Sequence, residues 1–247
     1  MDHYETILKE AKENDDILGL ILSGSRGKEF ENEYSDYDIQ IIAKDEAVEA
    51  LKQKYKNVEN MDLSVSPLSD FKKHSEWGSP EAWDRYDYAH IKILVDKTGE
   101  LQKLVKEKGC IPPDKLGAFI DWNIDAYVNG VYRSVKCVRN KNSFGAHIEA
   151  SNSMLDLLTL VFALNGRLRP FLGYTEKELE KYQLEHLPWT PMEFIEKIKK
   201  VLETADLATQ QELLIGMEKM CRAMGHGHMF DGWEGKDRWT MEFKPTP

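Results

Sequence analysis

The hydrophobic pattern of the chain changes near residue 109, and this change limits the folds that the chain can adopt. Before that point, stretches with helical spacing are interrupted by short apolar runs, at residues 17–22, 37–43, 61–65 and 90–95. Short apolar runs that end in turn residues are typical of buried strands, and strands that alternate with helices indicate a sheet covered by helices. Beyond that point only helical spacing remains. We therefore predict an α+β domain over residues 1–109 and an all-α helical bundle over residues 110–247.

Local signals place the ends of several elements. Residues 109–113 read Gly-Cys-Ile-Pro-Pro, a turn-forming segment that separates the two predicted domains. Asp45 is predicted to cap the helix that follows the second strand. Residues 154–164 are apolar on nearly every side, which predicts a central helix in the bundle. The last twenty or so residues are rich in glycine, and we expect them, with His226 and His228, to form an irregular, mobile tail.

Two carboxylates stand at the start of the second predicted strand. Asp36 and Asp38 are separated by one residue, so their side chains point to the same side of that strand. Like charges held this close repel each other, and a divalent cation between them removes the repulsion. Mg²⁺ prefers such oxygen ligands and commonly binds one or two carboxylates together with substrate phosphates. Asp36 and Asp38 are therefore candidate metal ligands and catalytic residues.

A small-residue turn follows the first predicted strand and complements these acids. Gly24 and Ser25 would let backbone N–H groups approach a phosphate where the chain enters a helix. Arg26 and Lys92 are the basic residues that we expect to help bind a nucleotide there, and Lys28 could add to the positive charge of the turn. For the phosphates to reach the acids, the first two strands must run antiparallel.

Asp62 opens the third predicted strand and is the third candidate acid. If this strand runs parallel to the second, Asp62 lies beside Asp36 and Asp38. Three carboxylates that hold two metal ions are the groups needed for in-line phosphoryl or nucleotidyl transfer. Asp62 would either bind metal or accept the proton of the attacking hydroxyl.

These motifs resemble the signature of the DNA polymerase β-like nucleotidyltransferase superfamily. Its pattern is a Gly-Ser pair followed, after a short helix, by Asp36-Tyr37-Asp38-Ile39. The segments 62–68 and 91–97 are similar to bacterial aminoglycoside adenylyltransferases, notably the streptomycin 6-adenylyltransferase group. The resemblance covers residues 5–108, and is weaker over the helical half.

The resemblance implies a mixed-sheet catalytic domain and a set of residue roles. Asp36, Asp38 and Asp62 would bind two Mg²⁺ ions, Asp62 would also act as the base, and Gly24 and Ser25 would hold the triphosphate of ATP or another NTP. The helical domain of this family closes over the acceptor. The implied activity is transfer of a nucleoside monophosphate, such as AMP, to a hydroxyl of a small molecule, including an aminoglycoside-like antibiotic, with release of pyrophosphate.

The charge and the cysteine content of the chain bear on which partners it binds and where it is located. The net charge is −10, and residues 1–110 carry 24 acidic and 16 basic side chains. This balance argues against a nucleic-acid partner and favours a cationic small-molecule acceptor. The N-terminal residues show no secretory signal, no apolar run spans a membrane, and three widely spaced cysteines fit a reducing compartment. We therefore expect a cytoplasmic enzyme, either monomeric or homodimeric.

Two alternatives stay open. The chain could modify a protein or a nucleotide, as toxin-like members of the superfamily do, or it could be a non-catalytic nucleotide-binding module. The identity of the acceptor, the preferred NTP and the roles of Arg167, Arg169, His226 and His228 are not determined by the sequence.

Overall fold

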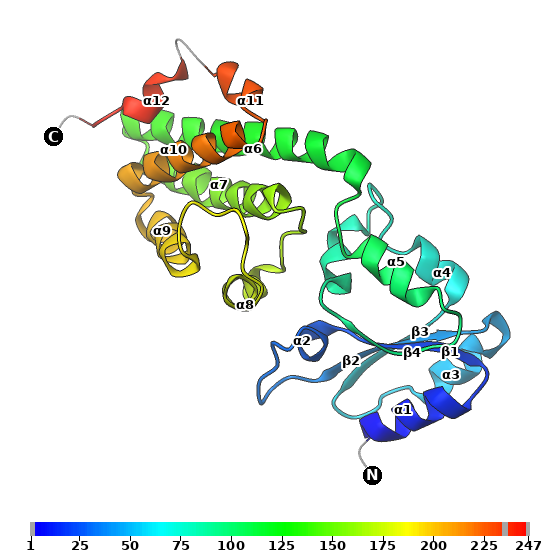
Figure 1. Cartoon of the computed structure of the whole chain (residues 1–247). Helices are drawn as coiled ribbons and strands as arrows, with labels where there is room; N and C mark the ends of the chain where they lie inside the picture. Colours follow the sequence, from blue (N-terminus) through cyan, green and yellow to red (C-terminus); the bar gives the residue numbers. More distant parts are fainter. Residues whose placement is uncertain (1–2, 234–236, 246–247) are drawn as a thin grey trace. The chain divides into compact units, whose positions relative to one another are not determined.

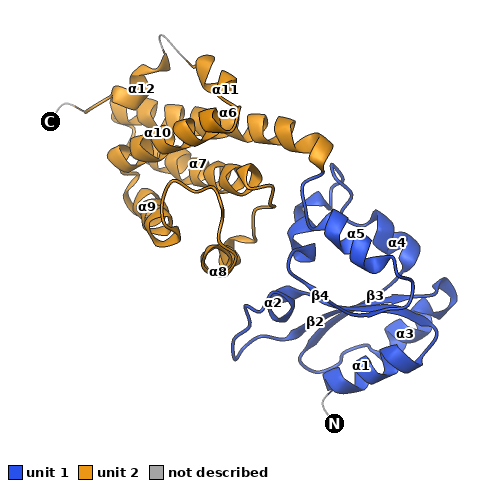
Figure 2. Cartoon of the chain, viewed as in Figure 1, with its two compact units in different colours: residues 1–112 blue, residues 113–247 orange. Residues whose placement is uncertain are grey.

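The computed structural model describes residues 3–233 and 237–245, which form two compact units. Unit 1 ends at Pro112 and unit 2 begins at Pro113, three residues after the predicted boundary (Figure 2). Unit 1 contains a sheet with helices, and no strand occurs in the described part of unit 2. The predicted class, a mixed-sheet α+β unit followed by a helical unit, is confirmed.

Unit 1 is built on a four-stranded sheet in the order β3-β2-β1-β4. The strands are β1 (Ile17–Leu22), β2 (Tyr37–Ala43), β3 (Met61–Pro67) and β4 (Lys92–Asp96). β1 pairs antiparallel with both β2 and β4, whereas β2 and β3 are parallel. Both orientations that the site requires, antiparallel for the first pair and parallel for the second, are therefore present.

Helices cover both faces of this sheet (Figure 1). On one face, α1 (His3–Glu13) and α3 (Val48–Lys54) contribute Ile7, Ala11 and Leu51 to a core with the apolar side chains of β1 and β2. On the other face, α4 (Leu68–Lys73) and α5 (Leu101–Lys108) enclose a smaller core. The short helix α2 (Gly24–Gly27) follows β1 directly.

Two local predictions in unit 1 are wrong. Asp45 does not cap a helix: it is the first residue of the 3-10 turn η1 (Asp45–Ala47), Lys44 holds the cap position, and no side chain caps the turn. The fourth strand begins at Lys92 and not at His90, because His90 has a φ of 58°, a left-handed conformation that a strand does not accommodate. The 3-10 helix η2 (Ala82–Tyr88) precedes it.

Unit 2 is a set of helices around α7 (Ser143–Leu164). α7 packs along α6 (Pro113–Arg139) and contacts α9 (Pro191–Thr204), and residues 160–164 are all buried. The prediction of a central helix there is confirmed. The other elements before the C-terminal segment are η3 (Leu172–Tyr174), α8 (Thr175–Lys181) and α10 (Leu207–Ala223).

The C-terminal segment is more ordered than we expected from its glycines. It contains the short helices α11 (His228–Asp231) and α12 (Trp239–Glu242), while residues 234–236 and 246–247 lie outside the described residues. His226 Nδ1 lies 2.7 Å from Asp121 Oδ1 of α6, and His228 Nε2 lies 3.3 Å from Asp121 Oδ2. The expectation that these two histidines belong to a mobile tail is therefore wrong: both lie against the same carboxylate.

Within the described ranges, no helix is long and apolar enough to cross a membrane.

Candidate active site

The three predicted acids lie at one end of the β2–β3 pair. Asp36 directly precedes β2, Asp38 is its second residue, and Asp62 is the second residue of β3. Asp38 and Asp62 are partners in the parallel register. Neighbouring strands are about 4.8 Å apart, so the two aspartates are adjacent across the sheet. Asp36 and Asp62 are exposed, and Asp38 is half-buried.

The electrostatics of Asp38 show that the acids influence one another. Burial, and then the negative charges of Asp36, Asp87 and Asp62 in that order, together raise the pKa of Asp38 to about 6, whereas Lys28 acts in the opposite direction. A carboxylate under such repulsion gains stability from any cation that arrives beside it. The site therefore lacks positive charge at the position of Asp38.

The turn after β1 lies against this carboxylate. The Ser23 N–H donates to the Asp38 carbonyl over 2.9 Å, and Gly24 follows with a φ of 57°. A Cβ atom on Gly24 would lie 1.7 Å from Asp38 Oδ2. Only glycine therefore lets the backbone approach the acid this closely, and the predicted Gly24–Ser25 turn and Asp38 belong to one site.

Arg26 and Lys92, the two predicted nucleotide-binding cations, both have partners near this turn. Arg26 donates to the carbonyls of Ser35 (2.7 Å) and Asp36 (2.9 Å), and its guanidinium lies 4.2 Å from the Tyr37 ring centroid. Arg26 thus holds the segment that delivers Asp36. Lys92 pairs with Glu29 over 3.0 Å and lies opposite Leu22 in the β1–β4 register, at the end of the sheet where the turn begins.

Three further residues complete the network: Lys28, which was expected to add positive charge to the turn, and Gln40 and Asp87, which were not among the predicted site residues. Lys28 is fully buried; its ammonium donates to the Asp87 carbonyl over 2.8 Å and lies 3.6 Å from the Asp87 carboxylate. Gln40, two residues beyond Asp38 on β2, donates to Asp87 Oδ2 over 3.1 Å. Asp87 thus links the end of α2 to the sheet behind Asp38. The Lys28–Asp87 pair spans 59 positions, and no sequence motif marks Asp87.

We expect Lys28→Met to destabilise unit 1. The variant leaves the Asp87 carboxylate, which is mostly buried, without its cation, and removing one partner of a buried pair is strongly unfavourable. Because Asp87 keeps some solvent contact, we expect a loss of about 2 kcal/mol in the free energy of unfolding. Urea unfolding measures this loss. The double variant Lys28→Met/Asp87→Leu should recover part of the stability, and a double variant that is less stable than Lys28→Met would contradict the assignment.

The side chains do not form a preassembled metal cage. In residues 3–233 and 237–245, no group of three or more His, Cys, Asp or Glu side chains is placed to hold a metal ion in the conformations seen. The donor chemistry nevertheless suits Mg²⁺, because carboxylate oxygens converge on one strand end and the charge there is uncompensated around Asp38. The role of these acids in binding metal stays a prediction.

The arginines whose roles the sequence left open have partners inside unit 2. Arg167 pairs with the buried Glu178 and donates to the Tyr182 carbonyl. Burial lowers the pKa of Arg169, and the charge of Asp156 partly offsets this. Both arginines thus interact with residues of the helical unit.

Comparison with known proteins adds a loose structural similarity. No family model and no curated protein matches the sequence. Among solved structures, the chain is similar to a nucleotidyltransferase-like protein from Exiguobacterium sibiricum 255-15, at 15% sequence identity and a TM-score of 0.41. The match covers 95% of this chain and 79% of that chain. Because the similarity is this loose, the assignment of the site depends on the residues described above.

Proposed function

We propose that the protein is a Mg²⁺-dependent nucleotidyltransferase that moves a nucleoside monophosphate, in the simplest case AMP from ATP, to a hydroxyl of a small molecule. One observation carries this proposal: the parallel register places Asp38 beside Asp62, with Asp36 two residues before Asp38. The glycine turn against the Asp38 carboxylate supports it, because it brings the backbone of the turn and the acid together at one strand end.

Each group of the site has a role in this reaction. Asp36 and Asp38 would hold the metal, and Asp62 would serve as a further ligand or accept the proton of the attacking hydroxyl. Bound Mg²⁺ supplies charge neutralisation on the triphosphate and lowers the pKa of a coordinated hydroxyl. The backbone at Gly24 and Ser25 would lie along the phosphates. The hydroxyl oxygen forms a bond to the α-phosphorus as the bond to pyrophosphate breaks, and its proton passes to Asp62.

The acidity of unit 1 favours a cationic acceptor. Residues 1–110 carry eight more acidic than basic side chains. An aminoglycoside-like antibiotic meets this requirement, because it combines ammonium groups with hydroxyls. Modification of a protein or a nucleotide would use the same acids with a different acceptor.

Pyrophosphate release tests the proposal. The full chain is incubated with Mg²⁺ and each of the four NTPs, against a panel of aminoglycosides, lincosamides and a cell extract. We expect acceptor-dependent release with one NTP, and Asp62→Asn should reduce it by about 10²- to 10³-fold, since a positioned base or ligand is lost. Glu59→Gln, an exposed acid just before β3, is the matched control and should retain full activity.

Calorimetry with ATP separates this enzyme from a nucleotide-binding module. An enzyme of the proposed kind should bind ATP much more weakly when Mg²⁺ is removed. Equal binding with and without the metal, together with no pyrophosphate release from any acceptor, would support the non-catalytic module.

A further inference from the structure

The helix α2, which carries the glycine turn, is too short to hold its own position. It has four residues, and no side chain caps its N-terminus. A single helical turn is unfavourable unless other contacts stabilise it. The position of the turn relative to the acids therefore depends on contacts with the rest of unit 1, and the basic side chains at the end of α2, Arg26 and Lys28, make several of them.

Arg26 connects α2 to the segment that carries Asp36. Its Nε donates to the Asp36 carbonyl over 2.9 Å, and one of its Nη atoms donates to the Ser35 carbonyl over 2.7 Å. Residues 35 and 36 precede β2, which begins at Tyr37, so the strand ladder does not fix them. The two bonds from Arg26 therefore restrain the backbone from which the Asp36 carboxylate projects.

The guanidinium of Arg26 is also stacked on an aromatic ring. Its central carbon lies 4.2 Å from the centroid of the Tyr37 ring, and the Tyr37 ring stacks on Tyr4 of α1 at 4.7 Å. Two of the three guanidinium nitrogens thus serve the backbone of the protein, while the planar group packs on the ring. Arg26 is engaged by the protein before any nucleotide arrives, as is typical of a residue that positions a site.

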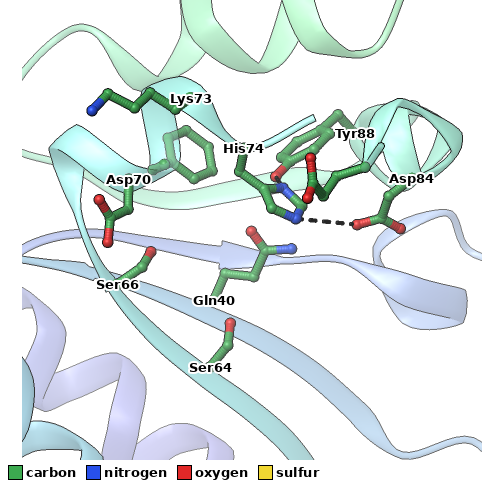
Figure 3. A pocket seen from close by; sticks show the side chains of 10 residues that line it. Gln40, Ser64, Ser66, Asp70, Lys73, His74, Asp84 and Tyr88 are labelled. Atoms are coloured by element: carbon green, nitrogen blue, oxygen red, sulfur yellow. Dashed lines mark hydrogen bonds and ion pairs between the residues drawn. The ribbon is translucent and has the colours of Figure 1, made fainter. Parts of the chain in front are cut away.

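Lys28 is tied to a different part of unit 1. Its partner Asp87 also accepts a hydrogen bond from Gln40, and Gln40 lines a cavity of about 560 Å³ (Figure 3). Lys28 is therefore part of the packing around this cavity, and its loss should affect unit 1 as a whole. Arg26 is the more specific probe, because its partners belong to the segment that carries Asp36.

We propose that Arg26 is a positioning residue for the metal site rather than a phosphate ligand: it holds the backbone of residues 35 and 36 so that the Asp36 carboxylate is oriented before Mg²⁺ arrives. The proposal rests on the proposed function, which supplies the metal. Removing a group that orients a metal ligand typically lowers metal affinity by about 10- to 100-fold. The charge of Arg26 acts in the opposite direction, because a cation near the acids repels Mg²⁺. Geometry and charge therefore predict changes of opposite sign when Arg26 is replaced.

Binding of Mn²⁺ to the full chain without nucleotide, measured by calorimetry, tests this assignment. Mn²⁺ prefers the same oxygen ligands as Mg²⁺. We expect Arg26→Met, which removes both the hydrogen bonds and the charge, to weaken Mn²⁺ binding by about tenfold. Arg26→Lys keeps the charge but cannot form the same planar pair of bonds, so it should also weaken binding. Lys44→Met removes a lysine that pairs with Asp16 and directly follows the opposite end of β2, and it should bind Mn²⁺ like the wild type.

Amide hydrogen exchange without metal gives a second readout that does not depend on metal binding. Exchange over residues 32–37 should be faster in both Arg26 variants than in the wild type, while the strands of unit 1 keep their protection. Unchanged exchange over residues 32–37 would overturn the positioning role. Faster exchange throughout the sheet in both variants would overturn it as well, because it would show a general loss of stability.

The outcomes separate this assignment from the proposed function. Unchanged or tighter Mn²⁺ binding by Arg26→Met would overturn the positioning role, and weaker binding of Mg²⁺–ATP by the same variant would then identify Arg26 as a phosphate ligand. Release of pyrophosphate by the wild type would leave the proposed function intact in that case. Mn²⁺ binding that both variants weaken supports the positioning role even where no acceptor yields pyrophosphate, a result that would refute only the catalytic function. A wild type that binds no Mn²⁺ would refute both.

Discussion

Replacing Asp38 with Asn should abolish Mg²⁺-dependent turnover while making the fold more stable at neutral pH. The amide has nearly the same shape, so the packing against the Gly24 turn is kept. It cannot bind Mg²⁺ as a charged ligand, and we expect activity to fall by about 10³-fold or more. At the same time, the substitution removes the charge that Asp36, Asp87 and Asp62 repel. Loss of function with a gain in stability is typical of a site that keeps unfavourable charges for its chemistry.

The stability gain should depend on pH in a defined direction. The pKa of Asp38 is about 6 in the folded chain, above the ordinary value of 3.8. The folded state therefore disfavours the ionised group, and this cost is fully present above pH 6 and absent below pH 4. Because Asp38 is only half-buried, solvent screens much of the effect, and we expect Asp38→Asn to raise the free energy of unfolding by about 1 kcal/mol at pH 7 to 8.

Urea unfolding between pH 4 and pH 8 measures this difference, with Glu59→Gln as the control that should match the wild type throughout. Adding Mg²⁺ should stabilise the wild type more than Asp38→Asn, because binding to the folded state adds to stability. An Asp38→Asn variant that is equally active, or less stable than the wild type at pH 8, would contradict the role that we assign to this acid.

Gly24→Ala should cause the largest loss of stability among single substitutions at the site. The methyl group would lie 1.7 Å from Asp38 Oδ2 and 2.9 Å from Asp38 Cβ, so more than the end of the side chain must move. The φ of 57° adds backbone strain for any residue with a Cβ. We expect the free energy of unfolding to fall by about 3 kcal/mol, and activity to be lost because the displaced Asp38 can no longer face Asp62.

Gly99→Ala is the matched control for this prediction. Gly99 also has a positive φ, 72°, but a Cβ there would meet nothing within 4 Å. It therefore carries the same kind of backbone strain, about 1 to 2 kcal/mol, without the collision. If thermal and urea unfolding show equal losses for the two variants, then the close approach of the turn to Asp38 is not what makes Gly24 necessary.

The elements of unit 1 could be predicted because each strand is a short apolar run. The sequence predicted that Asp62 lies beside Asp38 on the condition that the second and third strands are parallel, and the register meets that condition. The start of the fourth strand could not be predicted, because a left-handed conformation at His90 leaves no signature in the residue type.

The Lys28–Asp87 pair and the cavity were beyond prediction for a different reason. They depend on the path of residues 68–88, where no periodic pattern indicates how the chain crosses the sheet. His226 and His228 were misread because glycines around them favoured an irregular tail, whereas the Asp121 carboxylate, more than 100 positions earlier, engages both rings. A contact between two single polar side chains on distant segments produces no recognisable pattern in one sequence.

The sheet order places Asp62 and Asp38 in strands with different numbers of neighbours. β3 is an edge strand and borders only β2, whereas Asp38 sits in an interior strand held on both sides. The position of Asp62 therefore depends on one strand pairing, whereas that of Asp38 depends on two.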